Sequence, residues 1–418
     1  MSIIAVFNGI FCMGEHVVGD LAAGTGYRIV TDKDLVAEAT SLSGMPESKI
    51  ERAFSSKTSV FNSFTHEKES SIAHLRLALA EVFCGQDFIL HGFGTLLIPK
   101  EISHALTVCL IADMKFRTGA AAKAQGLPEK EAIKVIRRGD EDCAAWGESI
   151  LRQNDPWDAD LYDMVIPMHK TSLEEAANLI RKNAEKSVLD PTETSKRTCE
   201  DFMLASRAEA ALAKEGHNVK VNAKEGALTL TINKHVLMLG RLEEELRSIA
   251  EKLEGVTSVE TKVGKDFHRS DIYRKHDFEA PSRVLLVDDE REFVQTLSER
   301  LMMRDMGSAV AYDGDTALNL IKEDEPEVML LDLKMPGIDG LDVLRQVKET
   351  RPEIEVIILT GHGSEADREM CMKLGAFAYL QKPLDIDFLS ETIKKANEKI
   401  REKSAARNEH GTTAGSNV

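Results

Sequence analysis

The chain lacks several features that mark particular classes of protein. It has no run of about 20 consecutive apolar residues, so the sequence predicts no membrane-spanning helix. Its six cysteines are scattered, without a CxxC pair or a His/Cys ligand spacing. This pattern argues against disulfides and zinc and favours a cytoplasmic protein. The apolar N-terminus has no basic segment and carries Glu15, which is not typical of a secretory signal.

Positive charge is also in short supply. The chain has 53 Lys and Arg against 70 Asp and Glu, which gives a formal net charge of −17. Affinity for nucleic acid depends mainly on basic side chains that neutralise phosphates, so this balance argues against DNA as a partner. A transcription factor would also need a DNA-binding helix pair, and only a short polar tail follows residue 400.

The hydrophobic pattern divides the 418 residues into about three domains. Strand-like apolar runs alternate with amphipathic segments in the first and last parts, which is typical of parallel α/β sheets. The predicted order is an α/β domain (1–182), a linker (183–199), a small α+β domain (200–265), a linker (266–282), an α/β domain (283–402) and a disordered tail (403–418).

The predicted strands of the C-terminal domain end in chemically active side chains. These are Asp288 and Asp289, Asp332, Thr360, and Lys382. The carboxyl ends of parallel strands line one crevice, so we expect these side chains to meet there. Three neighbouring carboxylates repel one another, and Mg²⁺ with its preference for oxygen ligands would relieve this repulsion. A carboxylate in such a site can accept a phosphoryl group whose charge a lysine and a threonine would stabilise.

This arrangement resembles the receiver domain of two-component response regulators, over residues 283–400. The resemblance implies a flavodoxin-like (βα)5 fold in which Asp332 is the phosphoacceptor, Asp289 binds Mg²⁺ directly and Asp288 acts largely through water. It further implies roles for the Lys334 carbonyl in the metal shell, for Lys382 beside the phosphoryl group, and for Thr360 and Tyr379 as switch residues. The implied phosphodonor is a histidine kinase or a phosphotransfer protein, and the implied output acts on the upstream domains or on a protein partner.

A glycine motif follows the first predicted strand near the N-terminus. Gly9 and Gly14 have the GxxxxG spacing of a phosphate-binding loop between a strand and a helix. A working loop continues with Lys and Ser or Thr, whereas this one continues with Glu15 and His16. A carboxylate at this position would repel phosphate, although the backbone N–H groups at a helix start still favour an anion. The sequence therefore leaves open whether this loop holds any nucleotide.

Four segments of the first 182 residues resemble cytidylate kinase-like proteins. They span 26–36, 87–94, 106–146 and 162–180. The chain departs from that family where the family carries positive charge, at Glu15, Phe93 and the acidic run that ends in Cys143. The resemblance implies a degenerate P-loop nucleotide-kinase fold without kinase activity. Arg117 is interpreted as a helix-surface arginine, with a phosphate contact as the alternative reading.

The middle domain carries the pattern of a β-hairpin, with two alternating runs on either side of residues 224–226. The segments 226–230 and 255–259 resemble a BON-type domain, a family linked to the binding of lipids or partner proteins. The alternative is a packing or dimerisation module, which leaves a homodimer open.

The whole sequence predicts a response regulator in which self-phosphorylation of the receiver is the only enzymatic step. The alternative is an active nucleoside-monophosphate kinase that a receiver regulates.

Overall fold

The protein is described here from a computed structural model, in which residues 3–83, 87–234, 239–264, 283–304, 306–361 and 364–412 are described. The chain divides into two compact units. The first comprises residues 1–58 and 67–273, and the second comprises residues 59–66 and 274–418. Within the described ranges, none of the helices is long and apolar enough to cross a bilayer.

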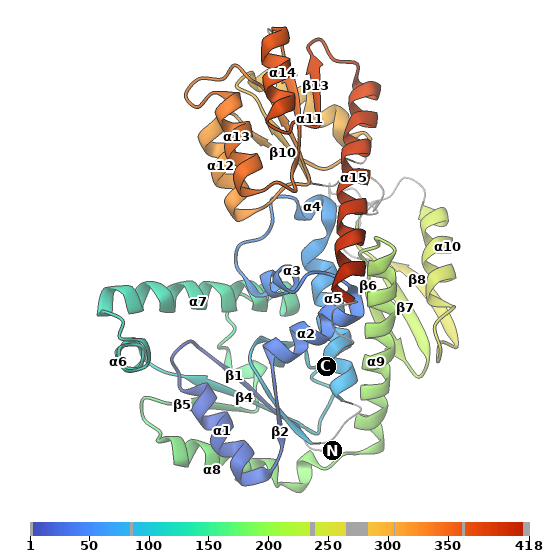
Figure 1. The fold of residues 1–418 in the computed structure, drawn as a ribbon. Helices are drawn as coiled ribbons and strands as arrows, with labels where there is room; N and C mark the ends of the chain where they lie inside the picture. Colours follow the sequence, from blue (N-terminus) through green and yellow to red (C-terminus); the bar gives the residue numbers. More distant parts are fainter. Residues whose placement is uncertain are drawn as a thin grey trace. The chain divides into compact units, whose positions relative to one another are not determined.

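A five-stranded sheet forms the centre of the first unit (Figure 1). Its strands are β1 (Ile3–Asn8), β2 (Arg28–Thr31), β3 (Phe88–His91), β4 (Ala105–Ile111) and β5 (Met164–Pro167). They pair in the order β2-β3-β1-β4-β5, and every pairing is parallel. The strand β1 is apolar at five consecutive positions because both of its faces are buried, as is usual in parallel sheets.

Helices cover both faces of this sheet. Their bounds are α1 (Gly14–Thr25), α2 (Asp32–Ser43), α3 (Glu47–Glu51), η1 (Arg52–Phe54), α5 (Glu67–Val82), η2 (Phe93–Leu97), α6 (Met114–Gln125), α7 (Glu129–Leu151), η3 (Ala159–Leu161), α8 (Leu173–Ala184) and η4 (Ser187–Leu189). One apolar core lies between the sheet and α2, α5 and α7, and a second lies between the sheet and α1 and α8. This layered α/β arrangement confirms the predicted fold class.

The middle region belongs to the same unit. It comprises α9 (Glu193–Lys214), β6 (Lys220–Lys224), β7 (Ala227–Ile232), α10 (Leu239–Ala250) and β8 (Ser258–Val263). The strands β6 and β7 are antiparallel, and β8 lies parallel to β7. Glu225 and Gly226 have φ angles of 49° and 84°, the left-handed backbone that tight hairpins require. The predicted hairpin is therefore present, whereas the BON-type resemblance stays a prediction.

The structure differs from the sequence prediction over the first linker, 183–199. Residues 193–199 begin the long helix α9, which starts with a capping box between Thr192 and Ser195. The helix packs against the N-terminal region, where the rings of Phe83 and Phe202 lie 5.7 Å apart. The middle region is thus joined to the N-terminal region through a shared helix, not through a polar linker. The second predicted linker, 266–282, lies outside the described residues.

A second five-stranded parallel sheet forms the centre of the other unit. Its strands are β9 (Val284–Val287), β10 (Ser308–Ala311), β11 (Val328–Leu331), β12 (Glu355–Thr360) and β13 (Ala378–Gln381). Its helices are α4 (Asn62–Thr65), α11 (Arg291–Met302), α12 (Gly314–Glu323), α13 (Gly340–Thr350), α14 (Glu365–Lys373) and α15 (Ile386–Thr412). The strand order β10-β9-β11-β12-β13 is the flavodoxin-like order, which confirms the predicted fold of this domain.

Two apolar layers enclose this second sheet. One contains side chains of α12 and α13, and the other contains side chains of α11 and α15. The helix α15 continues to Thr412, so the tail predicted to be disordered from residue 403 is helical over its first ten residues. The short segment 59–66 also belongs to this unit, which the sequence did not predict.

Candidate functional site

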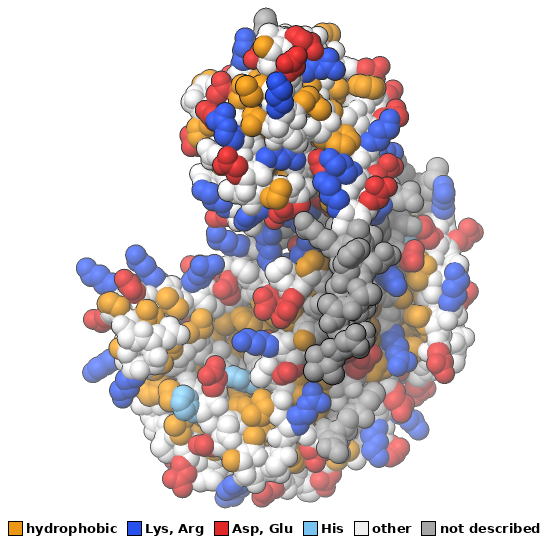
Figure 2. Space-filling view, viewed as in Figure 1, with side chains coloured by type: hydrophobic (Ala, Val, Ile, Leu, Met, Phe, Trp, Pro, Cys, Tyr) orange, Lys and Arg blue, Asp and Glu red, His pale blue; other side chains and the backbone are white. Residues whose placement is uncertain are grey.

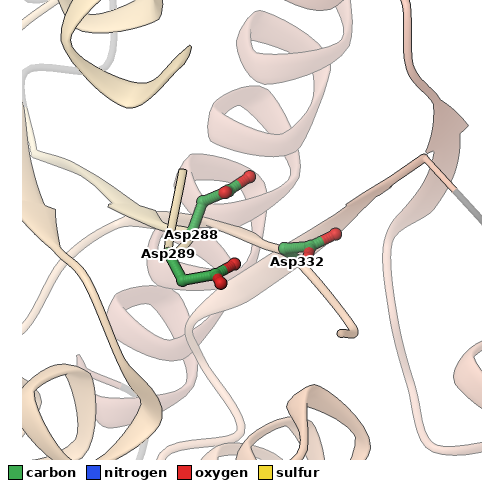
Figure 3. A group of neighbouring side chains, drawn as sticks. All are labelled: Asp288, Asp289 and Asp332. Atoms are coloured by element: carbon green, nitrogen blue, oxygen red, sulfur yellow. The ribbon is translucent and has the colours of Figure 1, made fainter. Parts of the chain in front are cut away.

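Three carboxylates meet at the carboxyl edge of the second sheet (Figure 3). Asp288 and Asp289 follow β9, and Asp332 follows the neighbouring strand β11. One ligand oxygen from each lies within 4.8 Å of those of the other two. Asp288 and Asp332 are only 4% and 6% exposed, while Asp289 is open to solvent. The predicted acidic cluster is therefore assembled by adjacent strand ends.

Lys382 contributes the positive charge of this cluster. Its Nζ donates a hydrogen bond to Asp288 Oδ2 at 2.6 Å and lies 4.0 Å from Asp332 Oδ1. Burial lowers the pKa of Lys382, but the hydrogen bond and charge of Asp288 outweigh burial and hold it above its ordinary value. The ammonium group is thus kept charged next to Asp332, where it could compensate an incoming anion.

Two partners of Lys382 were not predicted from the sequence. Glu290 Oε1 lies 3.4 Å from its Nζ, and the ring of Phe293 lies 4.2 Å from it by the centroid. Both residues come just after the acidic pair at the start of α11, so their place in the chain was the available signal. They contact the Lys382 ammonium group in addition to the carboxylates that follow the strands.

The electrostatics single out Asp332 among the three acids. Burial raises the pKa of Asp332 to about 6, with Lys382 opposing this shift and Asp288 adding to it. The backbone N–H of Lys334 donates to Asp332 Oδ2 at 3.2 Å, which orients the carboxylate. At neutral pH the Asp332 carboxyl is therefore mostly ionised, as a nucleophile requires.

Thr360 and Tyr379 lie on the neighbouring strands β12 and β13. Thr360 ends β12 and is 1% exposed, and its carbonyl accepts a hydrogen bond from the Lys382 N–H at 2.9 Å. Tyr379 lies on β13 and packs against the apolar layer that contains α12 and α13. Its hydroxyl is buried without a hydrogen-bond partner among the described residues. A buried, unpaired hydroxyl is costly, which makes this side chain suited to a change of position.

The donor set fits a hard divalent cation. All three clustered groups offer carboxylate oxygens, and Asp288 is almost fully buried, with Lys382 as its basic partner at the cluster. Mg²⁺ takes a few carboxylates and retains waters, and the exposed Asp289 leaves one side of the site open to solvent. The sequence-predicted ligands Asp288, Asp289 and Asp332 therefore lie where one ion could contact all of them.

The glycine loop of the first unit lies between β1 and α1, as predicted. Gly14 begins α1, and a side chain there would collide with the amide of Asn8. Asn8 in turn contacts His91, with 2.7 Å between its Oδ1 and the imidazole Nε2. Glu15 is exposed in the first turn of the helix, where a nucleotide-binding loop would carry its lysine.

Aromatic rings surround Phe93, which stands where the cytidylate kinase-like family carries positive charge. The ring of Phe93 lies 5.1 Å from that of Phe54 and 6.2 Å from those of Phe7 and Trp146. The Trp146 indole N–H also donates to the Phe93 carbonyl at 2.9 Å. Cys143, the third departure from the family pattern, is 3% exposed and packs in the same core. These positions serve packing and supply no charge for a phosphate.

Arg117 is buried, so its interpretation as a helix-surface arginine is wrong. It is 7% exposed and forms a two-pronged ion pair with Asp140, at 2.6 and 2.9 Å. Its Nε also donates to the carbonyl of Ile10 in the glycine loop at 2.9 Å. The side chain that could have bound a phosphate beside this loop is thus already neutralised by a carboxylate.

Comparison with known families identifies both α/β regions. Residues 284–394 match the response regulator receiver domain, and residues 3–170 match the cytidylate kinase-like family. The chain therefore carries a receiver domain, which defines the class of signalling proteins to which its C-terminal part belongs. Upstream of that domain, it carries a cytidylate kinase-like region.

Known relatives resemble the receiver domain. Over 104 residues the chain is 42% identical to the transcriptional regulatory protein CpxR of Escherichia coli and of Klebsiella pneumoniae. The matched residues make up 25% of this chain and 44% of each relative. Among solved structures, a CheY-like receiver protein from Methanospirillum hungatei is 26% identical over 29% of this chain and 97% of its own, with a TM-score of 0.28. A receiver domain protein from Clostridium thermocellum is 34% identical over 28% and 95%, also with a TM-score of 0.28. The chain spans less than half the length of the CpxR proteins.

Proposed function

We propose that this chain is a two-component response regulator in which Asp332 accepts a phosphoryl group from a histidine kinase or a phosphotransfer protein. The observation that carries this proposal is the cluster of Asp288, Asp289 and Asp332 with Lys382, at the carboxyl edge of a receiver-type sheet. In the proposed step, an Asp332 carboxylate oxygen forms a bond to phosphorus while the bond from phosphorus to the donor imidazole nitrogen breaks. The product is an aspartyl phosphate.

The residues around Asp332 would divide the remaining work. Asp288, Asp289, Asp332 and the carbonyl of Lys334 would hold Mg²⁺, which when bound supplies positive charge beside the phosphoryl oxygens. The Lys382 ammonium would transfer its contact from Asp288 toward the phosphoryl group, since it already lies 4.0 Å from Asp332. Thr360 would donate its hydroxyl to a phosphoryl oxygen, because its strand ends beside that of Lys382.

The output would be a change of conformation. Movement of Thr360 toward the phosphoryl group would vacate space into which Tyr379 could turn, and its unpaired hydroxyl would gain new partners. The affected surface would signal to the upstream regions or to a protein partner. DNA is not part of this proposal, because the net charge is −17 and acidic and basic side chains are interspersed on the face seen in Figure 2.

Binding of beryllofluoride, a phosphoryl mimic, tests the proposal. The full chain should bind it when Mg²⁺ is present, as followed by fluorine NMR, and Asp332→Asn should abolish binding because it removes the nucleophilic carboxylate. Asp342→Asn is the matched control, since Asp342 is an exposed carboxylate of the same domain paired with Arg345, and it should bind normally. Equal binding by wild type and Asp332→Asn would refute the assignment.

A further inference from the structure

The segment 59–66 is a part of the second unit whose role the proposed function does not explain. It follows η1 in the sequence and precedes α5, so its neighbours along the chain belong to the kinase-like region. Nevertheless, the segment belongs to the same compact unit as the receiver domain. The contacts that the segment makes there are specific.

The carboxylate of Asp324 is the centre of these contacts. Asp324 follows the last residue of α12 and is 2% exposed. Its Oδ2 accepts two hydrogen bonds from the segment, from Ser59 Oγ and from the Val60 backbone N–H, each at 2.8 Å. A buried carboxylate needs such donors, because a charge without them is expensive to remove from water.

Arg283 completes the receiver side of the contact. Its Nη2 donates to Asp324 Oδ1 at 2.7 Å, and its guanidinium carbon lies 5.4 Å from the ring centroid of Phe61. Phe61 is fully buried, and Arg283 is 7% exposed. One charged pair of the receiver therefore binds a hydroxyl, a backbone N–H and an aromatic face of the segment.

The segment is shaped for this contact by its own hydrogen bonds. The Phe61 N–H donates to Ser59 Oγ at 3.1 Å, and the Asn62 N–H donates to the Ser59 carbonyl at 3.1 Å. These bonds form a serine-initiated turn that leads into α4. The turn directs the Ser59 hydroxyl and the Val60 N–H toward the same carboxylate oxygen.

This contact lies at the opposite edge of the receiver sheet from the acidic cluster. Arg283 directly precedes β9, and Asp288 directly follows it, with four strand residues between them. The five residue steps from Arg283 to Asp288 span about 17 Å of extended chain. The contact with the segment 59–66 and the acidic cluster are therefore separate sites of the receiver domain.

We propose that the receiver domain has a second interaction surface, formed by Arg283 and Asp324, and that its partner is the segment 59–66 of the same chain. The surface selects a serine turn followed by an aromatic residue. It fixes the segment to the receiver by a contact that is independent of the chemistry at Asp332.

Hydrogen exchange of the full chain, followed by mass spectrometry, tests this proposal. Asp324→Asn should raise the exchange rate of peptides covering 59–66 by about tenfold, because the amide has a single acceptor oxygen and its NH2 would face either the Ser59 and Val60 donors or the Arg283 guanidinium, with no carboxylate charge left between them. Asp342→Asn, which removes an exposed carboxylate of the same domain, should leave this rate unchanged. An unchanged rate in Asp324→Asn would overturn the proposal.

A variant on the segment side guards against a folding defect of the receiver. The double variant Ser59→Ala/Phe61→Ala should give the same rise in exchange while beryllofluoride binding at Asp332 stays at the wild-type level. Loss of beryllofluoride binding in this variant would contradict the independence of the two edges. Protection of 59–66 that depends on protein concentration would show that a second copy supplies the segment, which would overturn the intrachain assignment.

Discussion

At the residue scale, the described structure gives several charged side chains of the first unit internal partners that the sequence does not reveal. Arg117 and Asp140 are separated by 23 positions, on α6 and α7, and only the packing of these helices brings them together. Asp32 shows the same behaviour, since its two oxygens accept the backbone N–H groups of Phe93 and Gly94 at 2.8 Å each. Local patterns cannot predict pairs of this kind, because they depend on the tertiary fold.

Asp32 offers a test of this description. Asp32→Asn should destabilise the first unit by about 1–3 kcal/mol, because an amide can accept only one of the two N–H groups and would set a donor against the other. Burial raises the pKa of Asp32 to about 6, so the experiment belongs well above that pH, where the carboxylate is ionised. Urea unfolding followed by tryptophan fluorescence reports on this unit, since both tryptophans, Trp146 and Trp157, lie in it.

Asp20 supplies the matched control. It is an exposed acid on α1, and Asp20→Asn should change the unfolding free energy by less than about 0.5 kcal/mol. Equal unfolding midpoints for the Asp32 and Asp20 variants would contradict the role given to the buried carboxylate.

At the scale of elements, the sequence predicted what depends on local pattern and missed what depends on distant contacts. The receiver strands could be predicted because they are short apolar runs. Asp288 and Asp332 could be predicted as site residues because each directly follows such a run. The start of α9 was predicted to be a linker because its residues are mostly polar, although Thr192 caps a helix there. The end of α15 was missed because an ion-pair cluster on a distant strand supports it.

That cluster is centred on Glu355, the first residue of β12. Glu355 is 1% exposed, and its carboxylate lies 2.9 Å from Lys399, 2.8 Å from Lys403 and 3.6 Å from Lys348. Lys399 and Lys403 lie four positions apart, on one face of α15. Burial raises the pKa of Glu355, but the three lysines outweigh burial and hold it below its ordinary value of 4.5.

Removal of this charge should loosen α15. In Glu355→Gln, amide exchange in α15 should rise by a factor that corresponds to about 1–3 kcal/mol, because Lys348 would lose its buried partner. Since the pKa is lowered in the folded state, the stabilisation is complete above about pH 4.5 and is lost as the pH falls below it. The wild type should therefore approach the variant in acid, after correction for intrinsic exchange.

Glu391 gives the comparison for this experiment. It forms an exposed pair with Lys395 on the same helix, so Glu391→Gln should leave amide exchange in α15 close to the wild-type rate. A wild type and a Glu355→Gln variant that exchange alike in α15 at neutral pH would remove Glu355 as the anchor of this helix.

At the scale of the whole molecule, the two α/β regions differ in what they retain. The receiver domain has the carboxylates and the lysine that its family pattern predicts, whereas the kinase-like region lacks basic side chains at the positions where its family carries them. In the receiver, the acids and the lysine meet at one edge. In the kinase-like region, Phe93 and Cys143 are packed in a core, and Arg117 is paired with Asp140. Acidic side chains therefore have different roles in the two regions. In the receiver domain they form a candidate magnesium site, and in the kinase-like region one of them neutralises a buried arginine.

This contrast predicts that the full chain does not transfer phosphoryl groups from ATP to CMP. Phosphoryl transfer needs positive charge around the phosphates, and Glu15 would add repulsion there. Coupled-enzyme turnover should stay at background, both before and after treatment with acetyl phosphate. Turnover that appears only after this treatment would instead support a nucleotide kinase regulated by its receiver.

The central claim is that Asp332 is the residue that becomes phosphorylated. The most direct measurement is to incubate the full chain with acetyl phosphate and Mg²⁺, reduce the acyl phosphate with borohydride, and locate the reduced residue by peptide mass spectrometry. The account predicts reduction of Asp332 to homoserine in the peptide that follows β11, with no labelling when Mg²⁺ is chelated. Reduction at another acidic residue, or modification that persists in Asp332→Asn, would contradict it.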